Sequence, residues 1–207
     1  MPLLGKAAML LLFDIAEEAI AEHDEWHTQE HLPERLSIPG FVRGTRWRAV
    51  LGKPGYFVMY EVEELAVLTS KAYLERLNNP SPWTSKMMPF YQGMTRGFCS
   101  VKESVGAGLG GVGLLIRPKP PESTSARLLQ PRPGIGSAHV FERAATPPMT
   151  NEQRIRGADA GLDGALLVTG YSQGALESLM QTELAGAQLE CAIYRLEYAL
   201  TEREAGA

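Results

Sequence analysis

The order of the predicted elements most constrains this chain, because nearly the same order occurs twice in 207 residues. Continuous apolar runs and runs rich in β-branched and aromatic residues predict strands, and apolar residues at helical spacing predict helices. The first half reads strand, helix, strand, strand, helix, strand over residues 7–14, 16–32, 41–51, 56–62, 65–77 and 95–103. This βαββαβ order is the ferredoxin-like pattern.

The second half repeats the pattern with a weakened first helix. Strands are predicted over 112–117, 137–145, 165–171 and 191–200, and helices over 123–129 and 175–184. The first of these helices is short because 118–133 is rich in proline. The second and third strands are joined by a predicted loop with Pro147-Pro148 and the glycines of 157–164. We therefore predict two units, 1–105 and 106–207.

The glycine-rich stretch 106–113 lies between the two units. It has neither the Lys-Ser/Thr pair nor the strand–loop–helix context of a phosphate-binding loop. We interpret it as a linker or the start of a strand.

Several predicted strands are apolar on both faces, although helices can cover only one face of each antiparallel sheet. The second sheet is the simplest cover for the other face. The predicted fold class is therefore α+β: two tandem ferredoxin-like βαββαβ halves whose antiparallel sheets pair into a barrel, with the helices outside.

Composition excludes some partners and indicates a compartment. A net charge of −4 without a Lys/Arg-rich run argues against nucleic acid and against an anionic membrane surface. The longest apolar run, Ala7–Phe13, is too short to span a bilayer, and the acidic residues that follow do not suit a signal peptide. Cys99 and Cys191 form no CxxC motif and are expected to be free thiols in a cytoplasmic protein, with a disulfide between them as the alternative.

The helix predicted over 16–32 carries an unusual stripe. Its apolar face begins with Ala16, Ala19 and Ile20 and continues at 100° per residue into a polar cluster. That cluster consists of His23, Trp26, His27, Glu30 and His31. Three of the four histidines of the chain lie here, although burying imidazoles is costly unless they are hydrogen-bonded.

Pro33 is expected to kink this helix or to open a short turn after it, because proline removes a backbone donor. Glu34 and Arg35 then form a charge pair that holds the turn before Pro39-Gly40.

The histidine spacing suggests acid–base chemistry. His23, His27 and His31 follow one another at i, i+4 and i+8, and Glu30 lies three residues after His27. A carboxylate beside an imidazole fixes its tautomer and favours its protonated form, which suits a general acid or base. The cluster could instead be a structural hydrogen-bond network.

A metal site is a further alternative, since residues 27–31 spell H-x-x-E-H. Such a site needs a third ligand on a later helix, and only Glu75, Glu177 and Glu183 are available there, without a supporting motif.

The stretch from Trp26 to Phe41, W-H-x-x-E-H-L-P-E-R-L-x-I-P-G-F, resembles the first helix and second strand of the dimeric α+β barrel superfamily. The EthD-like and stress-responsive barrel proteins are the nearest members. The resemblance covers residues 7–103, and the second half follows only in element order. It implies a barrel of two paired ferredoxin-like units, here within one chain.

The superfamily includes cofactor-free monooxygenases, lactone isomerases, polyketide cyclases and haem enzymes. Its active sites commonly lie in a cavity between sheet and helices. By position, this implies that His27, Glu30 and His31 lie beside such a cavity. Residues 118–133 hold no counterpart of the motif, so one site per chain is expected.

We therefore expect a cofactor-independent enzyme of monooxygenase, isomerase or cyclase type that acts on a small apolar or aromatic molecule. Expected catalytic residues are His27, Glu30 and His31, and expected substrate-binding residues are His23, Trp26, Trp47 and Tyr60. No cofactor and no metal are expected, and the partners are a small-molecule ligand and, optionally, a second copy in a homodimer. The alternatives are a non-catalytic ligand-binding or structural protein of the same fold and a metal-dependent hydrolase.

Overall fold

The first half of the chain forms a four-stranded sheet with helices on one face. A computed structural model describes residues 2–145 and 150–206, so Pro147-Pro148 of the predicted loop lie outside the described residues. The strands are β1 (Ala7–Ile15), β2 (Phe41–Leu51), β3 (Tyr56–Val62) and β4 (Tyr91–Gly106). The helices are α1 (Ile20–Trp26), α2 (Leu32–Leu36), α3 (Lys71–Asn78) and α4 (Pro82–Met87), with a π-helical turn at His27–His31 and 3₁₀ turns at Glu17–Ala19, Leu65–Thr69 and Met88–Phe90.

The second half forms a matching sheet. Its strands are β5 (Val112–Arg117), β6 (Ile135–Arg143), β8 (Ala165–Gly170) and β9 (Glu190–Thr201), and a short strand, β7 (Ala160–Gly161), is added beside β4. Its helices are α5 (Glu122–Leu128), α6 (Asn151–Arg156), α7 (Gln173–Glu183) and α8 (Glu202–Ala205). Three strands, at 41–51, 56–62 and 112–117, have the predicted bounds.

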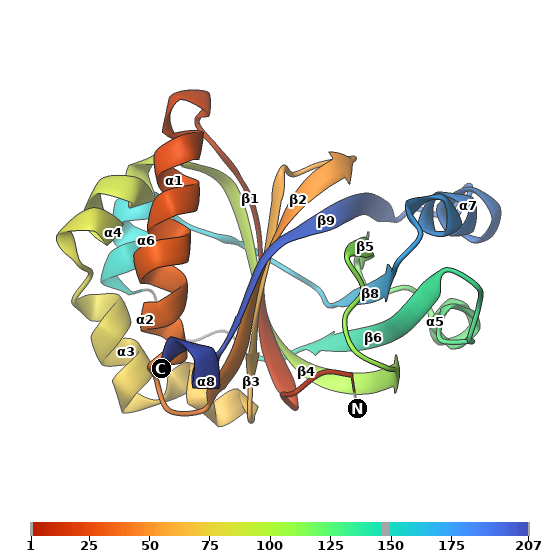
Figure 1. Cartoon of the computed structure of the whole chain (residues 1–207), viewed down its shortest axis with the longest axis horizontal. Helices are drawn as coiled ribbons and strands as arrows, with labels where there is room; N and C mark the ends of the chain where they lie inside the picture. The colour runs from red at the N-terminus through yellow and green to blue at the C-terminus, as the bar shows by residue number, and fades with distance from the viewer. Residues whose placement is uncertain (1, 146–149, 207) are drawn as a thin grey trace.

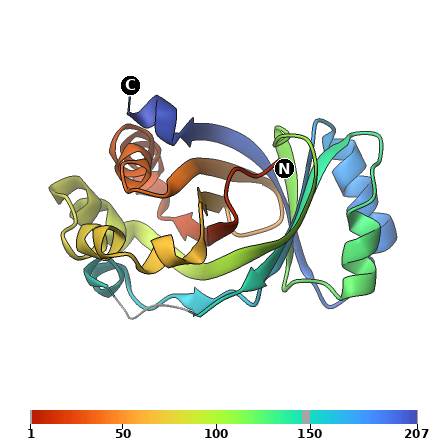
Figure 2. The ribbon, with the colours of Figure 1, turned by 90° about the horizontal axis from the view of Figure 1, so that it is seen from below.

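The two sheets close into one eight-stranded antiparallel barrel (Figures 1 and 2). The first half has the order β4-β1-β3-β2 and the second β9-β5-β8-β6, which is the same order once each half is numbered from its own first strand. The pairs β2–β9 and β4–β6 join the halves. The predicted fold class is confirmed, and the barrel closes within one chain. The boundary between residues 105 and 106 stays a prediction.

Alternation along each strand separates three cores. On β3, Phe57 and Met59 point into the barrel, and Tyr56, Val58 and Tyr60 point toward the helices of the first half. The barrel interior is filled by apolar side chains from both halves. A third core lies between the second sheet and α5 and α7. The space between the first sheet and its helices is therefore separate from the barrel interior.

The helix that carries the histidines does not stop at Pro33. It runs from Ile20 to Leu36 through the π-helical turn, where the Leu32 amide donates to the His27 carbonyl five residues earlier. This wider turn precedes the proline, which lies in the first turn of α2, where a missing amide is tolerated. The predicted charge pair is confirmed, because Arg35 Nη1 lies 3.2 Å from Glu34 Oε2.

The connection between β6 and β8 was predicted to be a loop, and that prediction was wrong. It contains α6, which begins with a capping box formed by Thr150 and Gln153. In Figure 1, α6 lies among α1–α4 and not beside α5 and α7. The second half therefore contributes α6 to the helical layer of the first half, in addition to the short α8, which contacts α2.

No helix in the ranges 2–145 and 150–206 is long and apolar enough to cross a membrane. Cys99 and Cys191 are free thiols, as expected. The cytoplasmic location stays a prediction.

Replacing Trp47 tests the packing of the barrel interior. This side chain is fully buried among apolar residues of both sheets. Trp47→Ala should lower the free energy of unfolding by about 3–5 kcal/mol, measured by urea denaturation. Val50→Ala, at a more exposed position of the same strand, is the matched control and should cost much less. Equal losses for the two variants would contradict a packed interior.

Candidate active site

Three histidine rings form a stack along the helix Ile20–Leu36, buried between that helix and the first sheet. The ring centroids of His23 and His27 are 5.6 Å apart, as are those of His27 and His31. All three side chains are buried. The stack forms because residues four apart share a helix face, and the π-helical turn keeps the last two rings on it. The predicted inward stripe is therefore present.

Aromatic side chains wall the stack. The Trp26 ring lies against His31 with a centroid distance of 4.3 Å. Phe13, Tyr56 and Tyr91 surround His23 at centroid distances of 5.7, 4.9 and 5.5 Å. These rings come from β1, β3 and the start of β4, so the first sheet supplies an apolar surround for the imidazoles.

The three histidines differ in how many of their ring nitrogens have a hydrogen-bond partner. His23 is satisfied on both nitrogens, with Asp24 Oδ1 at 3.1 Å from Nδ1 and Tyr91 Oη at 3.2 Å from Nε2. His27 Nε2 lies 3.3 Å from Tyr60 Oη. The Nδ1 atoms of His27 and His31 are buried without a hydrogen-bond partner among the described residues. Such atoms are costly in a purely structural network.

Burial keeps these imidazoles neutral. Loss of water lowers the pKa of His27 and His31 well below the ordinary histidine value, and the positive charge of Arg35 contributes in the same direction. Burial also lowers the pKa of His23, although Asp24 opposes that shift. Burial raises the pKa of the Tyr60 phenol, so this hydroxyl keeps its proton.

A small cavity lies beside one end of the stack. Its volume is about 30 Å³, enough for one water-sized species, and it is enclosed by the first sheet, α2, α3 and α6. Among its lining residues are His31, Arg35, Tyr60, Tyr73, Arg96 and Arg156. The cavity reaches His31 and Tyr60 directly, whereas His27 lies behind Tyr60. A porphyrin does not fit a space of this size.

Ion pairs between the two halves close this cavity. Arg35 Nη2 donates to both carboxylate oxygens of Glu152 on α6, at 2.5 and 2.7 Å, and both side chains are buried. Arg156 pairs with Asp159, whose Oδ2 also lies 3.1 Å from Arg96 Nε on β4. Charged groups from β4, α2 and the β6–β8 connection therefore meet at one place.

The structure brings His23, Trp26, His27, His31 and Tyr60 together but places Glu30 elsewhere. Glu30 Oε1 accepts a hydrogen bond from Trp26 Nε1 at 3.2 Å and another from the Ser81 hydroxyl at the start of α4. No hydrogen bond joins it to His27 among the described residues, because its carboxylate is directed toward Ser81 and Thr84 of α4. The expected role of Glu30 as the partner that orients His27 was wrong, and Tyr60 occupies that position.

Trp47 also lies away from the cluster. Its ring faces the barrel interior, where Nε1 donates to Thr45 Oγ1 at 2.9 Å. Strand alternation puts it on the sheet face opposite the histidines, so its expected contact with the same ligand was wrong.

The described residues do not provide the ligands that the metal-site alternative needs. Within the described parts of the chain, no three His, Cys, Asp or Glu side chains are grouped to hold a metal ion. The Glu of the H-x-x-E-H stretch is bound to Trp26 and Ser81 and does not face the two imidazoles.

Sequence reasoning missed most of the charged lining. Arg96 lies in the strand predicted over 95–103, which extends over 91–106, and Tyr73 lies in the helix predicted over 65–77, whose α-helical part is 71–78. An isolated arginine or tyrosine gives no signal of its own. Glu152 and Arg156 belong to α6, which was not predicted. The spacing Thr150-x-x-Gln153 is a capping-box signature and could have indicated that helix.

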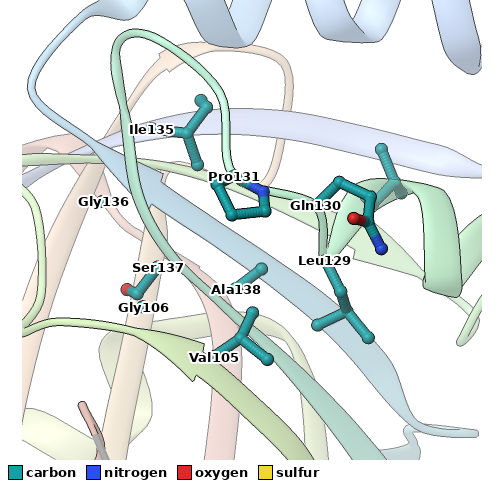
Figure 3. A pocket seen from close by; sticks show the side chains of 10 residues that line it. Val105, Gly106, Leu129, Gln130, Pro131, Ile135, Gly136, Ser137 and Ala138 are labelled. Carbon is teal, nitrogen blue, oxygen red and sulfur yellow. The ribbon is translucent and has the colours of Figure 1, made fainter.

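A second hollow, of about 80 Å³, lies on the other half between the end of β4, β6 and α5 (Figure 3). Its lining is mainly apolar, and Figure 3 shows Val105, Leu129, Pro131 and Ile135 around it. None of its lining residues is ionisable. It therefore lacks the groups needed for acid–base chemistry.

The fold is shared with known structures. An anthrone oxidase-like protein is 8% identical with a TM-score of 0.60, and the match covers 96% of this chain and 94% of that one. A protein of Fusobacterium nucleatum, provisionally named a monooxygenase, is 7% identical with a TM-score of 0.57, with 96% of each chain covered. A similarly named protein of Lactobacillus acidophilus is 9% identical with a TM-score of 0.54, covering 95% and 96%. The sequence itself matches no protein-family model and no curated protein.

These matches extend over nearly the whole chain, so both halves take part in the shared fold. The chain has the dimeric α+β barrel fold, with both ferredoxin-like units in one polypeptide. At such low identity the likeness shows the fold alone.

Neutral, buried histidines predict a pH-dependent stability. Because the unfolded chain binds protons near pH 6.5 and the folded stack does not, the free energy of unfolding should fall as the pH drops from 7.5 to 5.5. Each such histidine contributes at most about 1.4 kcal/mol per pH unit in this range. Urea denaturation of wild type and His31→Gln at several pH values measures the slope. An unchanged slope in the variant would mean that His31 titrates normally in the folded protein.

Proposed function

We propose that this protein is a cofactor-independent enzyme that moves a proton on a small, largely aromatic organic molecule. The observation that carries this proposal is the cavity bordered by His31 and Tyr60. The buried Nδ1 of His31 has no partner among the described residues, and Tyr60 is paired with His27 on its other side. Buried, unpaired titratable groups beside a cavity are typical of active sites.

His31 is the proposed general base. Its imidazole is neutral, so Nδ1 or Nε2 can accept a proton, and its low pKa means that the protonated form needs a neighbouring negative charge. Removal of a proton from an acidic C–H or O–H group produces such a charge on the substrate itself. The base thus works only while the substrate anion remains beside it.

Tyr60 and His27 are proposed to act as a second proton-handling pair. The Tyr60 hydroxyl borders the cavity and has His27 Nε2 at 3.3 Å on its other side. If His27 donates to the phenol oxygen, the Tyr60 proton is free to point at a substrate oxygen. His27 then positions Tyr60, and Trp26 provides an apolar wall.

Within this class we favour the monooxygenase type over the isomerase and cyclase types. Three structures with the same fold carry names of anthrone oxidase-like or monooxygenase proteins. An aromatic ketone with an acidic C–H, such as anthrone, suits a neutral base in an aromatic surround. Its anion reduces dioxygen: one oxygen atom replaces the two C–H hydrogens to give the quinone, and the other leaves with those two hydrogens as water. Such a ketone requires α6 to move away from α3, because the cavity is water-sized.

A non-catalytic role is the second candidate. The complete burial of the three imidazoles and the small volume of the cavity favour a structural or ligand-binding function. In that case the polar cluster would hold the helix to the sheet.

Oxygen uptake with anthrone, followed with an electrode on metal-free protein, tests the proposal. The wild type should consume oxygen faster than buffer, and His31→Gln and Tyr60→Phe should each lower kcat/KM by about 10²–10⁴-fold. Tyr194→Phe is the matched control, because its hydroxyl donates to the Pro54 carbonyl outside the site. That variant should retain the wild-type rate.

Two results would argue against the enzyme. One is the absence of oxygen uptake with anthrone and with simple phenols and β-dicarbonyl compounds. The other is a wild-type rate in both site variants. A large loss of stability in His31→Gln together with no turnover would favour the structural role, since removal of an active-site group often costs little stability.

A further inference from the structure

Arg96 is the most unusual charged group of the cavity. It is 6% exposed, and its Nη2 atom has no hydrogen-bond partner among the described residues. Its Nε lies 3.1 Å from Asp159 Oδ2, but the N–H direction does not form a hydrogen bond. A buried guanidinium normally has its donors satisfied, so this donor is available to a species in the cavity.

The charges around the cavity do not balance. Arg35 and Arg76 are opposed by Glu34 and Glu152, whereas Arg96 and Arg156 share the single carboxylate of Asp159, which leaves one positive charge. Glu152 and Asp159 each already accept hydrogen bonds from an arginine. An uncompensated buried cation is costly, and a bound anion would neutralise it.

The neutral groups of the cavity also favour an anion. The Tyr73 hydroxyl donates to Met9 Sδ at 3.2 Å, a weak acceptor that an oxygen anion would replace. Tyr60 has the alternative of donating into the cavity while its oxygen accepts from His27. Apart from the unprotonated nitrogen of His31, the cavity is therefore rich in donors and poor in free acceptors.

We propose that this cavity is a subsite for an anionic oxygen, with Arg96 as its main binding group. The substrate class is then a small organic oxyanion, either a carboxylate or the enolate formed by proton removal at His31. This inference rests on the proposed function for the identity of the ligand, but anion binding can be measured without turnover.

Formate and formamide are suitable probes, because they have similar size and only formate is charged. Isothermal titration of the wild type should show saturable formate binding and at least about tenfold weaker formamide binding. Arg96→Gln should weaken formate binding by about tenfold or more, as expected for loss of a charged hydrogen bond. Arg96→Lys retains the charge and should bind formate more tightly than Arg96→Gln. Arg132→Gln, which removes an arginine paired with Glu183 in the second half, should bind like the wild type.

Melting curves without ligand show whether each variant is folded. If Arg96→Gln is unfolded, the test consists of the comparison of formate with formamide in the wild type and of formate binding by Arg96→Lys. Equal binding of formate and formamide, or unchanged formate binding in folded Arg96→Gln, would overturn the subsite. With turnover, formate should raise KM for anthrone without changing kcat. Formate binding without such competition would overturn the assignment to the substrate oxygen, whereas binding without any turnover would retain the anion subsite and reject the proposed reaction.

Discussion

Desolvation of polar groups is the constraint on which the site depends. The layer between the first sheet and its helices buries three imidazoles, three arginines and several phenols among apolar side chains. Each of these groups loses water, and only some regain a protein partner. The pairs that do form, above all Arg35 with Glu152, connect α2 to a helix supplied by the other half. Two of the residues that keep unpaired atoms, His31 and Arg96, line one small cavity.

Closure of the barrel within one chain explains why the layer is asymmetric. Both halves have the same strand order, but only the first has a long helix with a histidine stripe, and the proline-rich segment of the second half forms only the short helix α5. The connection after β6 instead crosses to the helical layer of the first half (Figure 1), and α6 supplies lining residues of the cavity. One chain thus combines residues of both halves in a single site.

Much of the fold could be predicted from the sequence because the periodic elements are strong. The strands 41–51 and 56–62 combine β-branched and aromatic residues, 112–117 is an apolar run, and all three lie between clear turn signals with bounds that agree with the structure. The π-helical turn could not be predicted, since it depends on how the helix accommodates Pro33 against the sheet. The helix α6 is polar and short, and its position depends on the ion pair with Arg35, which no local pattern reveals.

The site was predicted in part for the same reason. A helical wheel places His23, Trp26, His27 and His31 on one face, and that local rule is independent of tertiary contacts. The partner of His27 is set by the tertiary fold. The observed partner is Tyr60 from β3, whereas the predicted one was Glu30 from the same helix. The prediction that Trp47 contacts the ligand failed because strand alternation directs its side chain into the barrel. Arg96 required the full three-dimensional arrangement.

The protonation state of the histidine stack tests this account most directly. Nitrogen-15 NMR of the imidazole rings, followed from pH 8 to pH 5, reports which ring nitrogens carry protons in the folded protein. We predict that His27 and His31 stay neutral throughout this range while the protein remains folded. Titration of either ring near pH 6.5 would show that the stack is exposed to water, and the buried site described above would then not exist.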